Sequence, residues 1–311
     1  QAHELLLKGR LYSNRGERRK APEYFLQAVK LDPNYAHAWA ELAYVYADLV
    51  EDNPKEYLPK GEAAARQALA LDESLAEAHI ALGVIKTYEW EWTSAEREFQ
   101  RAIELHPSDA RAHSIYASSY LSSMGRHKQA IAEAKRALEI DPLSLVAYEA
   151  IANAYYFARD YDQAIETVKK ALELEPHAPI VYDDLGNAYM LKGMYAEAIA
   201  AYQEKIRLGA DRSVLHVAIA IAYVRSGDHQ QARAILKQLL TSSEYVSPGD
   251  LPCLYAALGE WDQAFALLDK AVAAHDITMI YMIADPINDP LRSDPVAAVV
   301  DSNSEIGRAH V

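Results

Sequence analysis

Reactive side chains are numerous in this sequence, but few stand at the spacings that catalysis or metal binding needs. Asp183 and Asp184 are neighbouring acids of the kind that general acid and base catalysis uses. Neighbours on a helix point about 100° apart, so these two carboxyl groups cannot flank one bond of a substrate. The 11 histidines do not pair at ligand spacing, and the single cysteine, Cys253, cannot form an internal disulfide or a cysteine-based zinc site. We expect no metal site from these residues.

Motifs for cofactors and nucleophiles are missing as well. The chain lacks the glycine-rich dinucleotide and phosphate motifs, the nucleophile elbow Gly-x-Ser-x-Gly and the zinc motif His-Glu-x-x-His. We therefore predict that the chain is not an enzyme and binds no cofactor. One alternative stays open, in which the chain recruits substrates for a transferase or kinase whose catalytic domain lies outside this sequence.

Composition narrows the classes of partner. The chain has 311 residues, of which 51% are hydrophobic, so it has the material for a sizeable core and is too apolar for disorder. Its 31 Lys and Arg against 45 Asp and Glu give a net charge of -14, which repels phosphate backbones and disfavours nucleic acid. The longest apolar run, 214–224, falls far short of the ~20 residues that cross a bilayer, so we expect no membrane span.

The chain is organised as a repeat. One series of alanines recurs at intervals of 74, 35, 34, 34, 34 and 32 residues, and the interval of 74 contains one unit that is stretched to 40. The six extra residues lie near Pro54 and Pro59, which we expect to interrupt any helix there. The alanines of the series are Ala21, Ala95, Ala130, Ala164, Ala198, Ala232 and Ala264.

Each repeat unit has the apolar spacing of two helices. Tyr148, Ile151, Ala152 and Tyr155 stand at i, i+3, i+4 and i+7, and a second helical pattern follows the turn at 159–161. Units end on helix-stop signals such as Leu-Asp-Pro, and no stretch alternates at period two. The sequence therefore predicts an all-α fold of helical hairpins.

The unit resembles the tetratricopeptide repeat, whose signature is Trp-x2-Leu-Gly-x2-Tyr, then Ala-x3-Phe, then Pro. The resemblance covers about nine-tenths of the chain and implies a right-handed α-solenoid of about eight hairpins with a short C-terminal cap. The first motif is matched by Trp39, Leu42 and Tyr46 and by Leu185, Gly186 and Tyr189, and the second by Ala95, Phe99, Ala102 and Pro107. We expect hairpins to begin near Ala2, Ala36, Ala76, Ala110, Leu145, Pro179, Ser213 and Tyr245.

Most conspicuous aromatic and histidine residues have a packing role in this pattern. Tyrosine recurs at one first-helix position in seven units, and Lys86 replaces it in the eighth. His79, His113 and His216 occupy the position of the motif's Trp, so we expect packed or hydrogen-bonded histidines rather than metal ligands. The recurring tyrosines are Tyr12, Tyr46, Tyr120, Tyr155, Tyr189, Tyr223 and Tyr255.

Several stretches are similar to a narrower bacterial family, in which such an array follows a winged-helix DNA-binding, adenylate-cyclase or serine/threonine-kinase domain. They are 89–99, 141–144, 245–248 and 285–295. The resemblance implies that this chain, which begins at Gln1, is the sensory or partner-binding arm of a larger regulator. We expect it to be cytoplasmic, or else the extracytoplasmic arm of a membrane-anchored protein.

The domain prediction follows from the extent of the repeats. We expect one continuous repeat domain over 1–278, a capping segment over 279–300 and a disordered tail over 301–311. The end of that tail, 305–311, reads like the translation of a common short-read sequencing adapter, which indicates a sequencing remnant.

Function is then expected on the surface, in the groove lined by the first helices. The helix face offset by one residue from the packed face should line that groove, if the resemblance holds. Glu149 and Asp183 stand where chaperone-binding members of the family need a lysine, so we expect a basic or neutral protein or peptide partner rather than an acidic one. The same rule places Ile80 and Val84 in the groove. The predicted partner-binding residues are Tyr44, Tyr88, Arg111, Glu149, Asn153, Tyr156, Phe157, Asp183 and Asn187.

The sequence thus favours a protein-binding scaffold. Asn153 and Asn187 suit this function because an amide can both donate to and accept from the backbone of an extended peptide. A self-assembly module, in which the outer surface forms a homodimer, is the remaining alternative.

Overall fold

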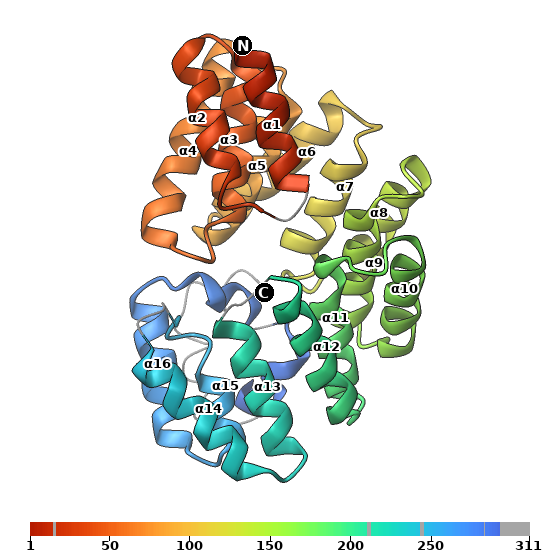
Figure 1. The fold of residues 1–311 in the computed structure, drawn as a ribbon, viewed down its shortest axis with the longest axis vertical. Coiled ribbons are helices and arrows are strands. Elements are labelled where there is room, and N and C mark those ends of the chain that lie inside the picture. Colours follow the sequence, from red (N-terminus) through yellow and green to blue (C-terminus); the bar gives the residue numbers. More distant parts are fainter. Residues whose placement is uncertain (15–16, 210–212, 243–245, 283, 293–311) are drawn as a thin grey trace. The chain divides into compact units, whose positions relative to one another are not determined.

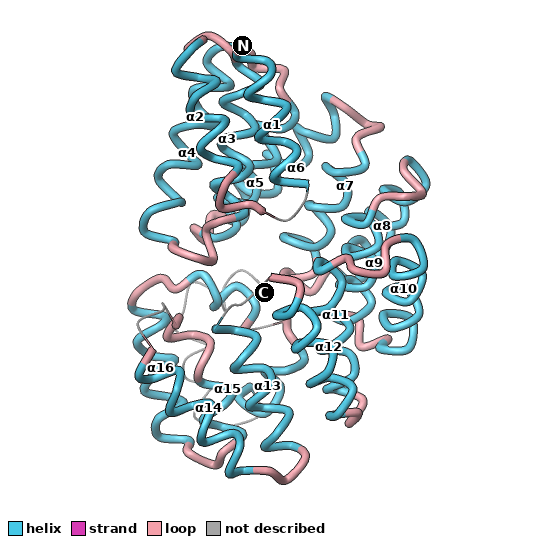
Figure 2. The backbone as a smooth tube through the Cα atoms, viewed as in Figure 1, coloured by secondary structure: helices cyan, strands magenta, loops and turns pink. Residues whose placement is uncertain are grey.

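The protein is helical throughout the part that its structure describes. The computed structural model describes residues 1–14, 17–209, 213–242, 246–282 and 284–292. Figure 2 shows helices joined by loops, and no strand occurs among the described residues. This confirms the all-α prediction.

The chain divides into two compact units, Gln1–Tyr120 (unit 1) and Leu121–Val311 (unit 2). In unit 1, successive helices pack side by side (Figure 1). Unit 1 contains α1 (Ala2–Asn14), α2 (Ala21–Leu31), α3 (Ala36–Asp48), α4 (Pro54–Leu71), α5 (Ala76–Tyr88), α6 (Trp92–Leu105) and α7 (Ala110–Ile115), which continues as the π-helix η1 (Tyr116–Leu121) across the unit boundary. Unit 2 contains α8 (His127–Ile140), α9 (Leu145–Phe157), α10 (Tyr161–Leu174), η2 (Pro179–Val181), α11 (Tyr182–Leu191), α12 (Tyr195–Arg207), α13 (Ser213–Arg225), α14 (His229–Thr241), α15 (Pro252–Ala257), α16 (Trp261–Ala273), η3 (Ile277–Tyr281), η4 (Pro286–Asn288) and α17 (Asp289–Arg292).

The helices follow one another as the hairpins of an α-solenoid. Each odd-numbered helix from α1 to α15 stands first in a hairpin, and the fourth pair, α7 and α8, falls on either side of the unit boundary. Seven of the eight predicted starts coincide with the first residue of a helix. The eighth was predicted at Tyr245, which lies outside the described residues, and its first helix, α15, begins at Pro252.

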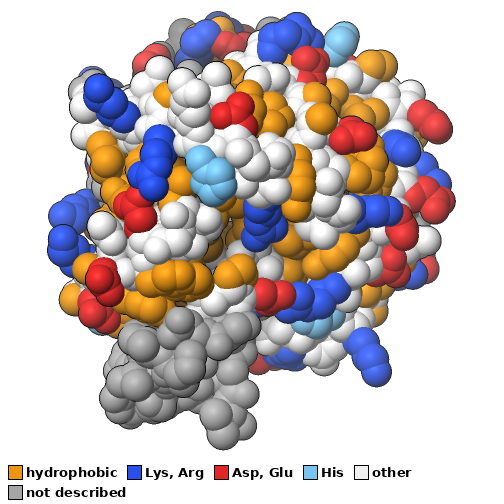
Figure 3. Space-filling model, turned by 90° about the horizontal axis from the view of Figure 1, so that it is seen from below, with side chains coloured by type: hydrophobic (Ala, Val, Ile, Leu, Met, Phe, Trp, Pro, Cys, Tyr) orange, Lys and Arg blue, Asp and Glu red, His pale blue; other side chains and the backbone are white. Residues whose placement is uncertain are grey.

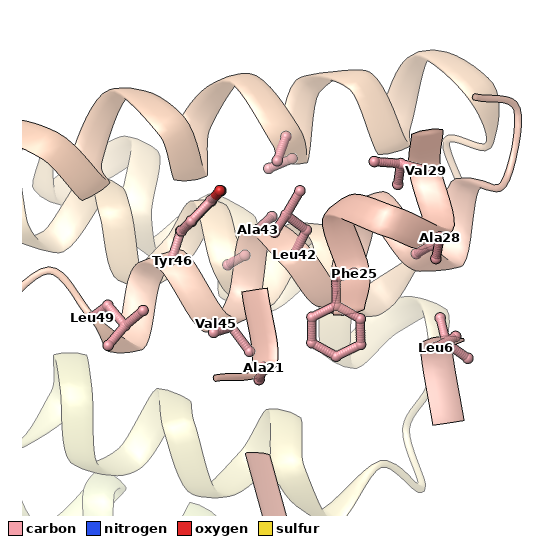
Figure 4. Packing of buried hydrophobic residues seen from close by; sticks show 14 of the residues in the cluster. Leu6, Ala21, Phe25, Ala28, Val29, Leu42, Ala43, Val45, Tyr46 and Leu49 are labelled. Carbon is pink, nitrogen blue, oxygen red and sulfur yellow. The ribbon is translucent and has the colours of Figure 1, made fainter. Parts of the chain in front are cut away.

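Close approach of the two helices in a hairpin depends on small residues. Every alanine of the repeating series, from Ala21 to Ala264, is fully buried. At Gly9 of α1 a Cβ would lie 2.4 Å from the ring of Phe25, and at Gly186 of α11 it would lie 2.4 Å from the ring of Tyr202, so only glycine allows these rings to lie against the helix. Figure 4 shows Leu6, Phe25 and Leu42 from three successive helices in the core of unit 1.

The motif's Trp position is a hydrogen-bonding position. The Nε1 of Trp39 donates to the carbonyl oxygen of Pro33 at 2.9 Å, six residues earlier. The Nε2 of His79 bonds the carbonyl of Glu73 at 3.3 Å, and that of His113 bonds the carbonyl of Pro107 at 3.1 Å, again six residues earlier. The prediction of hydrogen-bonded histidines is confirmed at these two positions, because a ring N–H of histidine reaches the same carbonyl.

Lys86, the exception among the tyrosines, joins three carboxylates. Its amino group lies 3.0 Å from Glu62, 2.7 Å from Glu89 and 3.1 Å from Glu91. Burial lowers the pKa of Lys86, and the hydrogen bonds to these glutamates raise it well above its ordinary value. A charge network therefore takes the place of the ring at this position.

The prediction that Pro54 and Pro59 interrupt a helix is wrong. The helix α4 begins at Pro54 and continues through Pro59 for 18 residues, so the insertion lengthens a helix. Proline is tolerated at the first helical position because the N–H that it lacks has no partner there. Pro59 costs one hydrogen bond within the second turn.

After α16 the chain forms two short 3-10 helices and α17, which cover 277–281 and 286–292. The division into a repeat domain up to 278 and a cap over 279–300 stays a prediction, and 293–311, including the predicted tail, lies outside the described residues. Every helix in the described part of the chain is too short or too polar to span a bilayer.

Candidate functional site

Tyr44 and Arg111 meet on the first-helix face of unit 1. Tyr44 comes from α3 and Arg111 from α7, 67 positions later in the chain, and the guanidinium carbon lies 4.9 Å from the centre of the tyrosine ring. Both side chains are half-buried. A guanidinium over an aromatic ring is attracted by the negative charge on the face of the ring, which favours this position of the arginine side chain. The structure thus brings together two of the residues that the sequence predicted.

A buried carboxylate supports this pair. Glu41 is only 5% exposed and accepts from Arg10 at 2.8 Å, while Arg111 lies 3.9 Å from its other oxygen. Burial lowers the pKa of Arg111, but the charge of Glu41 and the ring of Tyr44 raise it above its ordinary value. Two cations therefore share one buried anion, and Arg111 is held by Coulomb attraction rather than by a hydrogen bond to Glu41.

Tyr88 has a different local role in unit 1. Its hydroxyl donates to Glu51, in the turn after α3, at 3.1 Å. Ile80 and Val84, which the same rule placed in the groove, are buried in the core, with 0% and 7% of their surfaces exposed. That placement is wrong, because on α5 the face offset by one residue packs against neighbouring helices.

In unit 2 the predicted residues of α9 and α11 form a polar cluster with α12. The amide nitrogen of Asn153 lies 3.4 Å from the carboxylate of Asp184, which is 4% exposed. The amino group of Lys205 bonds the carboxylate of Asp183. Asp183 is therefore already paired with a cation, which reduces the negative charge that this surface offers to a basic partner.

Burial changes the proton affinity of the carboxyl groups in this cluster. It raises the pKa of Glu149 to about 7, with Lys205 lowering it and Asp183 raising it. Burial also raises the pKa of Asp184 well above its ordinary value, and the charges of Glu149 and Asp183 act in the same direction. Near neutral pH, the charge of this surface consequently depends on pH.

The second predicted amide is bonded within its own hairpin. The hydroxyl of Tyr202 donates to the amide oxygen of Asn187 at 2.6 Å. Tyr202 is the ring that lies against Gly186, so the contact fixes Asn187 at the end of a core side chain. The amide nitrogen of Asn153 and the amide oxygen of Asn187 are thus each hydrogen-bonded within the chain.

Tyr156 and Phe157 lie beneath another part of the chain. Their exposed fractions are 1% and 4%. The hydroxyl of Tyr156 donates to Asp285 at 2.5 Å, and the ring of Phe157 lies 6.4 Å from that of Tyr281. A partner can touch these two rings only where the segment that holds Tyr281 and Asp285 has moved away.

Sequence reasoning missed the residues that hold these groups in place, namely Glu41, Lys205 and Asp285. The sequence does point to Lys205, since it stands where most other units have alanine. No repeat pattern points to Glu41 or Asp285, because the periodicity of one unit does not show which residues of distant units are in contact.

Comparisons with known proteins agree with the architecture. One family model described as a tetratricopeptide repeat matches 91–144 and 149–212, a second matches 189–242 and a third matches 5–35. Together these matches cover more than half of the chain. Among curated proteins, no match was found.

Solved structures with similar folds include three with TM-scores above 0.5. The Cut9–Hcn1 heterotetramer of the APC/C has a TM-score of 0.68 at 16% identity, over 88% of this chain and 55% of that chain. The human IFIT1 dimer with m7Gppp-AAAA has a TM-score of 0.60 at 16% identity, over 96% of this chain and 82% of that one. A tetratricopeptide repeat protein from Parabacteroides merdae has a TM-score of 0.55 at 14% identity, over 85% and 98%. At such identities the likeness shows the fold alone, and with the family matches it establishes that this chain belongs to the tetratricopeptide repeat family.

Proposed function

We propose that the chain is a scaffold that binds a protein or peptide segment on the inner faces of its first helices. The observation that carries this proposal is the stack of Arg111 on Tyr44, two half-buried side chains from different hairpins. Interface energy concentrates in a few aromatic and arginine side chains that are held rigidly before binding. This pair has that chemistry, and both side chains come from first helices, whose inner face we propose as the binding surface.

The partner fits best as a neutral segment in unit 1. Arg10 and Arg111 share the charge of Glu41, and the charges of Asp109 and Glu77 also act on Arg111. The acidic groups around the two arginines therefore leave no excess of positive charge for an acidic partner. A peptide backbone would bond to the guanidinium of Arg111 through its carbonyl oxygens without adding charge.

The wider role that we propose is that of the partner-binding arm of a larger bacterial regulator. The support comes from the stretches at 89–99, 141–144 and 285–295 that resemble such regulators. A protein ligand also suits the net charge of -14 better than a nucleic acid does. On the face shown in Figure 3, coloured Lys and Arg side chains alternate with Asp and Glu, so this charge is not gathered into one field there.

The proposal can be tested by selecting ligands and mapping where they bind. Peptides enriched from a random display library by the whole chain are cross-linked to variants that carry benzoylphenylalanine at Tyr44 or Tyr88. Leu26 of α2, which is 45% exposed on a second helix, is the matched control position. We expect cross-links from Tyr44 and few from Leu26. Cross-links mainly from Leu26 would indicate that the binding surface lies on the second helices. They would favour the alternative in which the outer surface mediates self-assembly.

A further inference from the structure

The segment that follows the last hairpin returns to a helix about 130 positions earlier. Asp285 accepts from the hydroxyl of Tyr156 at 2.5 Å. Asp289 accepts two hydrogen bonds from the guanidinium of Arg159, at 2.5 and 2.8 Å. The two aspartates stand four residues apart, and their partners stand three apart at the end of α9. Two pairs of polar side chains therefore connect the segment to the end of α9, although the segment and this helix are far apart in the sequence.

Hydrogen bonds within the segment hold it in a defined conformation. Asp285 caps η4 by accepting from the backbone N–H of Ile287 at 2.9 Å. Arg292 donates to the carbonyl oxygens of Met282 at 2.6 Å and of Asp285 at 2.9 Å. These bonds hold both aspartates in position within one short stretch, and such preorganisation lowers the entropy cost of binding.

The other side of the segment borders a cavity of about 280 Å³ that is partly open to solvent. Along this cavity the segment does not pack closely against the hairpins that precede it, in contrast to the fully buried alanines within the hairpins. Ile221, Val224 and Arg225 of α13, His229, Cys253, Ala256 and Ala257 line the cavity from the hairpins, and Ile287, Pro290 and Leu291 line it from the segment.

We propose that the segment described by 281–282 and 284–292 is a displaceable internal ligand of the inner face of unit 2, and that a partner with the same chemistry binds there in its place. That partner is an acidic segment with two aspartates four residues apart, each followed by proline, and an aromatic residue four positions before the first aspartate. The proposal rests on the proposed function only in taking the first-helix face as a binding surface. It assigns an acidic ligand to Tyr156 and Arg159, in contrast to the basic or neutral partner that the sequence favoured.

Cys253 provides a native probe for opening, because it is the only cysteine of the chain and lines the cavity. Its thiol donates to Asn288 of the segment at 2.5 Å, and burial raises its pKa to about 12. The thiolate is the reactive form, so labelling by a maleimide should be slow while the segment is in place. Release of the segment removes Asn288 and increases the exposure of the thiol, which is half-buried while the segment is in place.

The first experiment measures the labelling rate of Cys253 in the whole chain. Arg159→Glu and Asp289→Arg each place like charges across the contact, and we expect about tenfold faster labelling in each. The double variant restores opposite charges across the contact and should recover part of the difference from the parent, because the substitution at 289 still removes the ion pair of Asp289 with Arg292. Lys170→Glu, in an exposed pair with Glu166 on α10, is the matched control and should label like the parent. Equal melting temperatures ensure that the rates report local opening.

The second experiment tests the partner. A fluorescent peptide of residues 276–292 is titrated into the parent and into the chain carrying Asp285→Asn and Asp289→Asn, in which the internal ligand is weakened and the surface is intact. We expect at least about tenfold tighter binding by the variant. A peptide with both aspartates replaced by asparagine should bind neither chain.

Two results would overturn the proposal. Labelling rates that are equal in the parent, Arg159→Glu and Asp289→Arg would make the segment a fixed part of the fold. Faster labelling without peptide binding to the Asn variant would show that the segment opens but that its surface does not take this ligand. Neither result affects cross-linking from Tyr44 in unit 1, so the proposed function stands or falls separately.

Discussion

Lys205 of α12 bonds Asp183 of α11 from the position at which most units carry a buried alanine. The side chain of Lys205 is 11% exposed, whereas that of Asp183 is 43% exposed. A cation buried among Asp183, Glu149 and Asp184 is held by their charges, and it limits the repulsion among them. The pair of Lys205 and Asp183 therefore stabilises the inner face of unit 2 and also holds its side chains in position.

Removal of this cation should destabilise the fold. We expect Lys205→Ala to lower the free energy of unfolding by about 1 to 3 kcal/mol at pH 8, because it leaves three neighbouring carboxyl groups without a counter-ion. Lys170→Ala, which removes an exposed lysine, should change it by less than about 0.5 kcal/mol. Urea denaturation measures both. Equal losses in the two variants would show that the cluster is not held by charge.

Stability should depend on pH through Glu149. Its pKa is about 7 in the fold because of burial, and it is near 4.5 in the unfolded chain. The stability that the protonated form provides is complete below pH 4.5 and is lost as the pH rises through 7. Glu149→Gln, which cannot ionise, should therefore stabilise the chain by about 2 to 3 kcal/mol at pH 8 and by little at pH 4.5. Urea midpoints at the two pH values test this, and an equal gain at both would refute it.

Packing within the hairpins should not tolerate larger residues. Ala164→Leu and Ala198→Leu force methylene groups between helices at fully buried positions, and each should cost about 1 to 3 kcal/mol. Ala196→Leu, at an exposed position of the same helix as Ala198, is the matched control and should be nearly neutral. Thermal melts followed by circular dichroism measure the three. Unchanged melting temperatures in both buried variants would mean that the repeat register is wrong.

The hydrogen bond from the motif's Trp position to the carbonyl oxygen six residues earlier should contribute to stability in each unit that forms it. Trp39→Phe and His113→Phe keep an aromatic ring but leave the carbonyl oxygens of Pro33 and Pro107 without these donors. We expect each to lower the free energy of unfolding by about 0.5 to 1.5 kcal/mol. The measurement is again urea denaturation. A loss seen for Trp39 and not for His113 would show that histidine serves this position through packing alone.

The sequence was informative about the hairpins and much less so about the groove. Helix starts at Ala76, Ala110 and Leu145 follow from a local pattern that repeats about every 34 residues, and a local pattern determines which helix face packs. Contacts such as Tyr156 with Asp285 join residues 129 positions apart. No periodicity encodes such a pairing, because it depends on where an irregular segment returns to the array.

The difference between local patterns and long-range contacts also explains why individual predictions were wrong. Ile80 and Val84 belong to a helix that is enclosed on more than one side, so an offset of one residue does not bring them to the surface. Pro54 suggests a break because proline disrupts helix interiors, whereas here it is the first residue of the helix.

The most direct test of the proposed binding surface is the affinity of one selected peptide for two arginine variants of the whole chain. Arg111→Ala removes the guanidinium stacked on Tyr44. Arg101→Ala removes an arginine of α6 that is 48% exposed and pairs only with Glu104, three residues away, among the contacts described. We expect a loss of about tenfold or more in affinity, or about 1.4 kcal/mol, for Arg111→Ala and no change for Arg101→Ala at equal melting temperatures. Equal affinities of the parent and Arg111→Ala would contradict binding on the first-helix face of unit 1.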